Sequence, residues 1–79
     1  MSEMQPTPIR SRATESILTW LRHDDAYANT RRWRWRHYAP LPAEAREWCL
    51  LVFGTHTPEG FAVSEADFDH IAAQIGEMP

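Results

Sequence analysis

The sequence predicts a small α+β domain, in which an N-terminal and a C-terminal helix pack on one face of a short antiparallel sheet. Helical periodicity near both ends, a period-two segment at 31–38 and an apolar run before a turn at 54–60 support this prediction. The 79 residues leave room for one domain over 1–79 with one modest core. Residues 1–7 are polar and interrupted by proline, and we expect a loose tail there.

The first helix is expected at about 13–27. Its apolar residues recur at helical spacing at Ala13, Ile17 and Leu21. We expect it to end near Asn29, a residue type that tolerates the left-handed conformation at a helix C-terminus.

A strand is expected at 31–38, because basic and aromatic residues alternate there with the period of a half-buried strand. The alternating residues are Arg32, Arg34 and Arg36 on one side and Trp33, Trp35 and His37 on the other. Pro40 and Pro42 close the segment, since neither can donate a hydrogen bond to a sheet.

Residues 42–53 allow two interpretations. The first half is helical in propensity, with Pro42 suited to a first turn, whereas Trp48 to Phe53 is a continuous apolar run that suits a buried helix or a central strand. We expect a helical turn at 42–46 followed by a strand at 47–53. The alternative is one helix over 42–53, which makes the chain a compact all-α three-helix domain.

The remaining segments complete the predicted sheet and add the last helix. Residues 54–60 form a turn and 61–63 return as the second strand of a hairpin. Ser64, with Asp67 three residues later, is a capping signature for a helix at 65–75. Its apolar stripe consists of Phe68, Ile71, Ala72 and Ile75, and Gly76 is expected to end it.

Charge is distributed unevenly along the chain. All eight basic residues are arginine and lie at or before Arg46, where five acidic residues leave a net charge of +3. The six acidic residues from Glu47 onward face no lysine or arginine and give −6, so the whole chain carries −3. This asymmetry points to charged partners and says little about the fold.

Two surfaces are candidates for partner binding. The arginine-rich segment contributes Arg32, Arg34, Arg36, Trp33 and Trp35, and arginine and tryptophan dominate protein interfaces and also suit nucleic acid. The acidic last third contributes Glu65, Asp67 and Asp69, which could meet an arginine-rich partner. The structural alternative is a two-faced strand with buried tryptophans and solvated arginines, and an ordinary solvated helix face for the acids.

Several function classes are not expected. Cys49 lies in an apolar run, where burial leaves a thiol inert, and the three glycines form no phosphate loop. The histidines His23, His37, His56 and His70 show no metal-binding spacing. We therefore expect no catalytic residue, no metal and no cofactor. The longest apolar run is too short to span a bilayer, so we expect no membrane partner and a cytoplasmic location.

In length and charge the chain resembles the small acidic inhibitors encoded by phages and mobile elements, including anti-CRISPR proteins. The resemblance implies a non-enzymatic binding protein that occupies a surface of a larger protein or nucleoprotein assembly. The alternative is a small nucleic-acid-binding or transcription-regulating module that uses the arginine-rich segment, which the net negative charge disfavours. A homodimer that sets the arginines of one copy against the acids of another also stays open.

Overall fold

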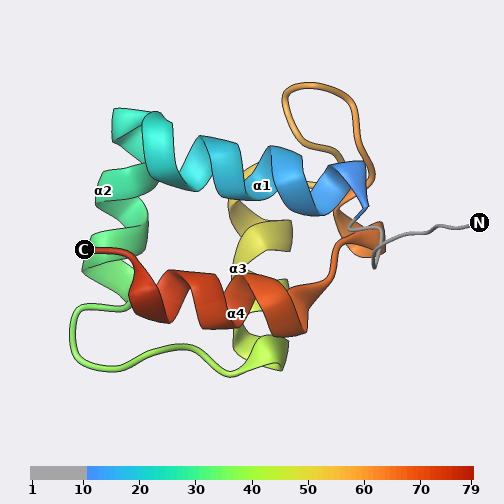
Figure 1. The fold of residues 1–79 in the computed structure, drawn as a ribbon. Helices are drawn as coiled ribbons and strands as arrows, with labels where there is room; N and C mark the ends of the chain where they lie inside the picture. The colour runs from blue at the N-terminus through green and yellow to red at the C-terminus, as the bar shows by residue number, and fades with distance from the viewer. Residues whose placement is uncertain (1–10) are drawn as a thin grey trace, which may run out of the picture.

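The computed structural model describes residues 11–79, which form four α-helices and one short 3-10 helix (Figure 1). In chain order they are α1 (Arg12–His23), α2 (Asp25–Arg34), α3 (Pro42–Phe53), η2 (Val63–Glu65) and α4 (Phe68–Glu77). The predicted α+β class is wrong, because residues 11–79 contain no strand. The all-α alternative predicted the correct class, but with three helices where the described residues form four α-helices. The tail predicted at 1–7 lies outside the described residues.

The predicted helix at 13–27 is two helices that meet at Asp24. Ser11 begins α1, where the Thr14 N–H donates to Ser11 Oγ at 3.1 Å. Asp24 has extended backbone angles and ends α1, and its carboxylate accepts from the N–H groups of Ala26 and Tyr27. One aspartate therefore interrupts the helix and caps the next one.

The strand predicted at 31–38 is wrong: its first half is the end of α2 and its second half is a loop. The buried positions of this region are Ala28, Arg31 and Trp35, spaced three and four residues apart. That spacing is helical. The alternation of arginine and tryptophan in this segment therefore does not reflect a strand. The helical spacing of the buried positions was hard to recognise because one of them is the charged residue Arg31.

The second half of α3 is helical, so the strand predicted at 47–53 and the separate turn at 42–46 are both wrong. Pro42 occupies the first turn, as expected, and the Leu41 N–H donates to Glu44 Oε1 at 2.9 Å. The helix buries Trp48 and Cys49 but leaves Leu51 82% exposed. The apolar run of this helix therefore includes a residue, Leu51, that does not belong to the core.

The predicted turn at 54–60 is present, but it does not join two strands. Gly54 and Gly60 have positive φ angles of 78° and 97°, which residues with a side chain rarely adopt. A single antiparallel bridge links His56 to Ala62. The strand predicted at 61–63 is therefore wrong, and Val63 instead begins η2.

The last helix starts and ends later than the predicted 65–75. Its cap is Asp67, whose carboxylate accepts from the His70 N–H at 3.2 Å, whereas Ser64 lies within η2. The helix continues through Gly76, where a Cβ atom would lie 3.2 Å from the Ala39 Cβ. A side chain at this position would therefore press against the loop after α2, whereas glycine allows the close approach. The predicted apolar stripe is confirmed, since Phe68, Ile71, Ala72 and Ile75 are all buried.

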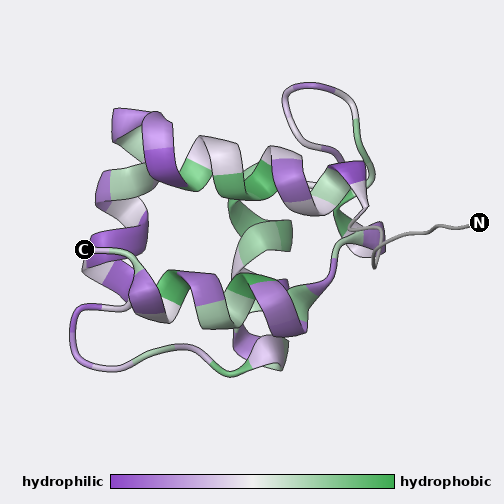
Figure 2. Cartoon of the chain, viewed as in Figure 1, coloured by the Kyte–Doolittle hydropathy of each residue, from purple (hydrophilic) through white to green (hydrophobic). Residues whose placement is uncertain are grey.

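Helices α1 and α4 run parallel, and α3 crosses them (Figure 1). At their N-terminal ends the Asp67 N–H donates to Thr14 Oγ1 at 2.8 Å, and at their C-terminal ends Arg22 donates to Gln74. Apolar residues gather where the helices meet (Figure 2), and their buried members form one cluster around Ile17, Leu21 and Ile71. The C-terminal ends of α1 and α4 both lie beside α2 (Figure 1).

The buried thiol of Cys49 predicts a specific pH dependence of stability. The side chain is 0% exposed, and burial raises its pKa from 9.0 to about 12. Above pH 9 the unfolded chain loses this proton while the folded chain keeps it, so the free energy of unfolding falls from pH 9 until about pH 12. Denaturant titrations should show a fall steeper in the wild type than in Cys49→Ala by up to about 1.4 kcal/mol per pH unit. Parallel curves for the two proteins would contradict a protonated, buried thiol.

Candidate functional site

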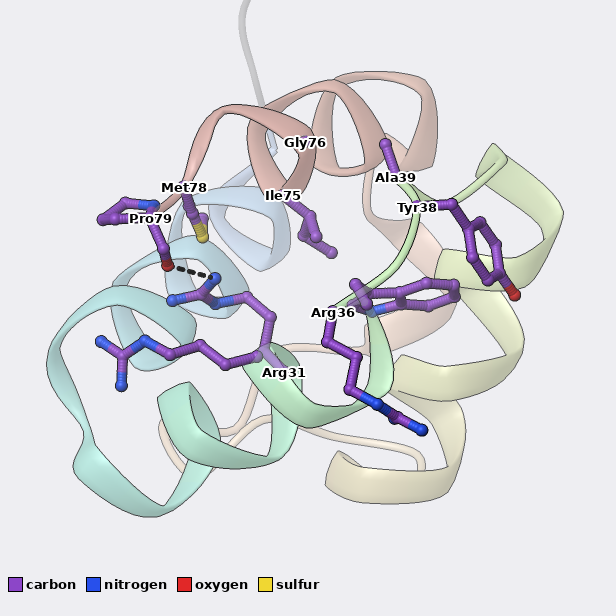
Figure 3. Close-up of a pocket in the computed structure, with 10 residues that line it drawn as sticks. Arg31, Arg36, Tyr38, Ala39, Ile75, Gly76, Met78 and Pro79 are labelled. Carbon is purple, nitrogen blue, oxygen red and sulfur yellow. Dashed lines mark hydrogen bonds between the residues drawn. The ribbon is translucent and has the colours of Figure 1, made fainter.

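Arg31 is a charged residue in a core position, only 4% exposed. Its Nε donates to the Leu21 carbonyl and its Nη1 to the main-chain oxygen of Pro79, both at 3.3 Å (Figure 3). The last carbonyls of a helix have no partner within that helix. Arg31 therefore ties the end of α1 and the residues after α4 to α2.

The pKa of the Arg31 guanidinium is lowered, first by burial and then by the nearby charges of Arg32 and Arg22. Like charges act on one another only at short range in salt solution. These three guanidinium groups, which we call the arginine cluster, therefore form one local concentration of positive charge. They come from the last turns of α1 and α2.

The arginines of this region are held by neutral groups. Arg22 donates to the Gln74 side chain and Arg32 to Asn29 Oδ1 at 3.0 Å. Arg34 donates to the Tyr38 hydroxyl at 3.0 Å, and Arg36 to the Trp33 carbonyl. None of these acceptors is a carboxylate, so the positive charges stay available to a partner.

The two tryptophans of the predicted strand have different environments. Trp35 is buried, packs edge-on against Trp48 and carries the Arg34 guanidinium 3.9 Å from its ring centroid. Trp33 is 69% exposed, with the Arg36 guanidinium 3.8 Å from its ring centroid. Of the predicted residues, the structure therefore brings Trp33, Arg36 and Arg32 to the surface of α2 and the loop after it, while Trp35 belongs to the core.

Two adjoining cavities of about 400 and 350 Å³ open between α2 and the C-terminal end of α4, and they share four residues, Arg31, Arg32, Met78 and Pro79. Among the other lining residues are Trp35, Arg36 and Tyr38 in the first cavity and Arg22, Gln74 and Glu77 in the second. Figure 3 shows Arg31 reaching towards Pro79, whereas Arg36 is directed away from it.

The predicted acidic residues lie at the other end of the molecule (Figure 1). Glu65 is exposed in η2, Asp69 is exposed in the first turn of α4, and Asp67 caps that helix. Since Asp67 contacts the N-terminal end of α1, the 12 residues of α1 separate these acids from α2. That distance, about 18 Å, exceeds the screening length of about 8 Å in physiological salt. The two candidate surfaces are therefore electrostatically independent.

Sequence reasoning missed Arg22, Arg31 and Gln74 as parts of this region. A signal was present: Asp24 and Asp25 are typical of a helix start, and Ala28, Arg31 and Trp35 then follow at helical spacing. Arg31 fits this helical pattern of core positions only if one of them is allowed to be a charged residue.

Two features of the described residues bear on metal binding and on thiol chemistry. Within 11–79, no group of three histidine, cysteine, aspartate or glutamate side chains is placed to hold a metal ion. The raised pKa of Cys49 keeps that thiol protonated near neutral pH. The same part of the chain contains no helix long and apolar enough to cross a membrane.

Comparison with known protein families, with characterised proteins and with solved structures finds no match to this chain. A function can therefore be proposed only from the chemistry and geometry of its own residues.

The contacts of Arg31 predict that it stabilises the fold far more than its neighbour does. Arg31→Gln shortens the side chain and leaves the main-chain oxygens of Leu21 and Pro79 without these donors, which should lower the free energy of unfolding by about 1–3 kcal/mol. Arg32→Gln is the matched control, because Arg32 is exposed and should change stability by less than about 0.5 kcal/mol. Denaturant unfolding of both variants measures the difference. Equal free energies of unfolding for the two variants would contradict a stabilising role of the Arg31 hydrogen bonds.

Proposed function

We propose that this protein is a non-enzymatic binding protein that docks the arginine-rich surface around α2 on an acidic surface of a larger protein or nucleoprotein assembly. The observation that carries the proposal is that, within residues 11–79, exposed Arg32 and Arg36 donate to neutral acceptors only, beside the exposed indole of Trp33. This surface is the docking surface, defined by Arg32, Trp33 and Arg36.

Its residue types and present partners favour an acidic protein surface. A carboxylate offers a guanidinium an opposite charge and two oxygens for a bidentate pair, whereas the present amide and carbonyl acceptors offer neither. A carboxylate of a partner therefore suits these arginines better than their present acceptors do. Trp33 adds a large apolar ring that a partner can bury, and arginine and tryptophan are the residue types most enriched in binding hot spots.

Inhibition is the mode of action that we propose for this binding. A small domain that docks on a larger assembly can act by covering a site there. In length and net charge it resembles small inhibitors encoded by phages and mobile elements, including anti-CRISPR proteins. That resemblance supports the mode and names no target.

Nucleic-acid binding is the second candidate function. Guanidinium groups without carboxylate partners suit phosphates, and an exposed indole suits base stacking. The net charge of −3 opposes it, because nucleic-acid-binding domains carry a basic excess. A protein partner is therefore the first proposal.

The acidic end offers a way for two copies to meet. A contact between the arginines of one copy and the acids of another joins opposite ends of the molecule (Figure 1). A twofold dimer built on this contact would set the two copies antiparallel and side by side, so that the contact is made twice. The homodimer stays a prediction.

Affinity capture with matched baits tests the proposed function. The baits are the wild type, a docking-surface variant with Trp33→Ala and Arg36→Gln, and a control variant with Leu51→Ala and Arg46→Gln. The control removes an equally exposed apolar side chain and the same charge from α3. We expect a host protein captured by the wild type and control to be depleted at least tenfold on the docking-surface variant.

Two outcomes would contradict the proposal. The first is capture of the same proteins by all three baits in equal amounts, which would show that α2 does not face the partner. The second is loss of capture after nuclease treatment together with a gel shift of a random oligonucleotide, which would establish the second candidate function instead.

A further inference from the structure

The three residues of the arginine cluster line the two adjoining cavities between α2 and the end of α4. We infer that these cavities form a binding site for a phosphate group, with Arg22, Arg31 and Arg32 as its cationic residues. The site goes beyond the proposed function, because it is a small-molecule site and two of its three arginines lie outside the docking surface.

The first step of the argument is the supply of hydrogen-bond donors. A guanidinium carries five N–H groups. Arg31 uses its Nε and Nη1 on the main-chain oxygens of Leu21 and Pro79, and Arg22 and Arg32 each donate to one side-chain oxygen. Among the described residues these bonds use four N–H groups of the cluster, so most of its donors have no partner there and can serve an oxyanion, while the present bonds hold the side chains in place.

The second step is charge. Four arginines, the three of the cluster and Arg36, and one acidic side chain, that of Glu77, are among the residues that line the two cavities. Like-charge repulsion within the cluster contributes to the lowered pKa of Arg31, and a bound anion would relieve it. A phosphate carries up to two negative charges and three strong acceptor oxygens, whereas a carboxylate offers one charge and two oxygens. Phosphate matches the cluster better.

The third step concerns the adjoining wall. The indole Nε1 of Trp35 is buried and has no hydrogen-bond acceptor, although buried donors are nearly always paired. Trp35 and Tyr38 both line the larger cavity, next to the arginines. Volumes of about 350 and 400 Å³ fall at the lower end of the range of small-molecule sites, about 300–1,000 Å³. The space and the aromatic wall suit a phosphate that stands alone or is esterified to a small ring-bearing molecule.

Calorimetric titration of the full chain at constant ionic strength tests this site. The probes are inorganic phosphate, adenosine monophosphate, adenosine and acetate. We expect phosphate and the monophosphate to bind at least tenfold more tightly than acetate and adenosine. Tighter binding of the monophosphate would identify a phosphate ester as the ligand class, and equal binding would identify free phosphate.

Matched variants connect the binding to the cluster. Arg22→Gln and Arg32→Gln remove exposed charges, so both proteins should stay folded, and each should weaken phosphate binding about tenfold or more. Arg46→Gln removes the same charge from α3, lines neither cavity and should leave binding unchanged. Three results would overturn the inference: no phosphate binding at millimolar concentration, equal binding of acetate, or an equal loss in Arg46→Gln. The docking-surface change Trp33→Ala should leave phosphate binding intact, which separates this site from the proposed function.

Discussion

Two parallel helices that end side by side create the constraint on which this structure depends. The Leu21 carbonyl near the end of α1 needs a hydrogen-bond donor in a place that the packing of α2 shields from water, and the exposed residue Pro79 after α4 lies within reach of the same donor group. Arg31 supplies the donors to Leu21 and Pro79 from within α2. A long side chain with several donors is the kind of group that can reach both helices from one position.

The same arrangement accounts for part of the uneven charge along the sequence. Helix N-termini favour negative side chains and helix C-termini favour positive ones. In α1 the acidic residue Glu15 lies in the first turn and Arg22 in the last, and in α4 Asp69 lies in the first turn. The last turn of α4 departs from this pattern, because it has no basic residue and contains Glu77. Helix polarity therefore accounts for only part of the uneven charge.

Sequence reasoning succeeded where one side of a helix is purely apolar and failed where charge or excess hydrophobicity obscured the pattern. The stripe of α4 and the burial of Cys49 were predictable from spacing and composition. The helix α2 was not, because Arg31 occupies a core position, and α3 was not, because exposed Leu51 continues an apolar run. The arginine-rich segment stays a predicted contact region, and the arginine cluster could not be predicted without tertiary structure, since Arg22 belongs to α1 and Gln74 to α4.

The most direct test of this account is the side-chain Nε–H signal of Arg31 in nitrogen-15 NMR spectra. The account predicts that this proton exchanges with water much more slowly than that of exposed Arg46, because it is buried and donates to the Leu21 carbonyl. Exchange as fast as that of Arg46 would contradict it, since Arg31 would then be solvated and the ends of α1, α2 and α4 would not be joined through its guanidinium.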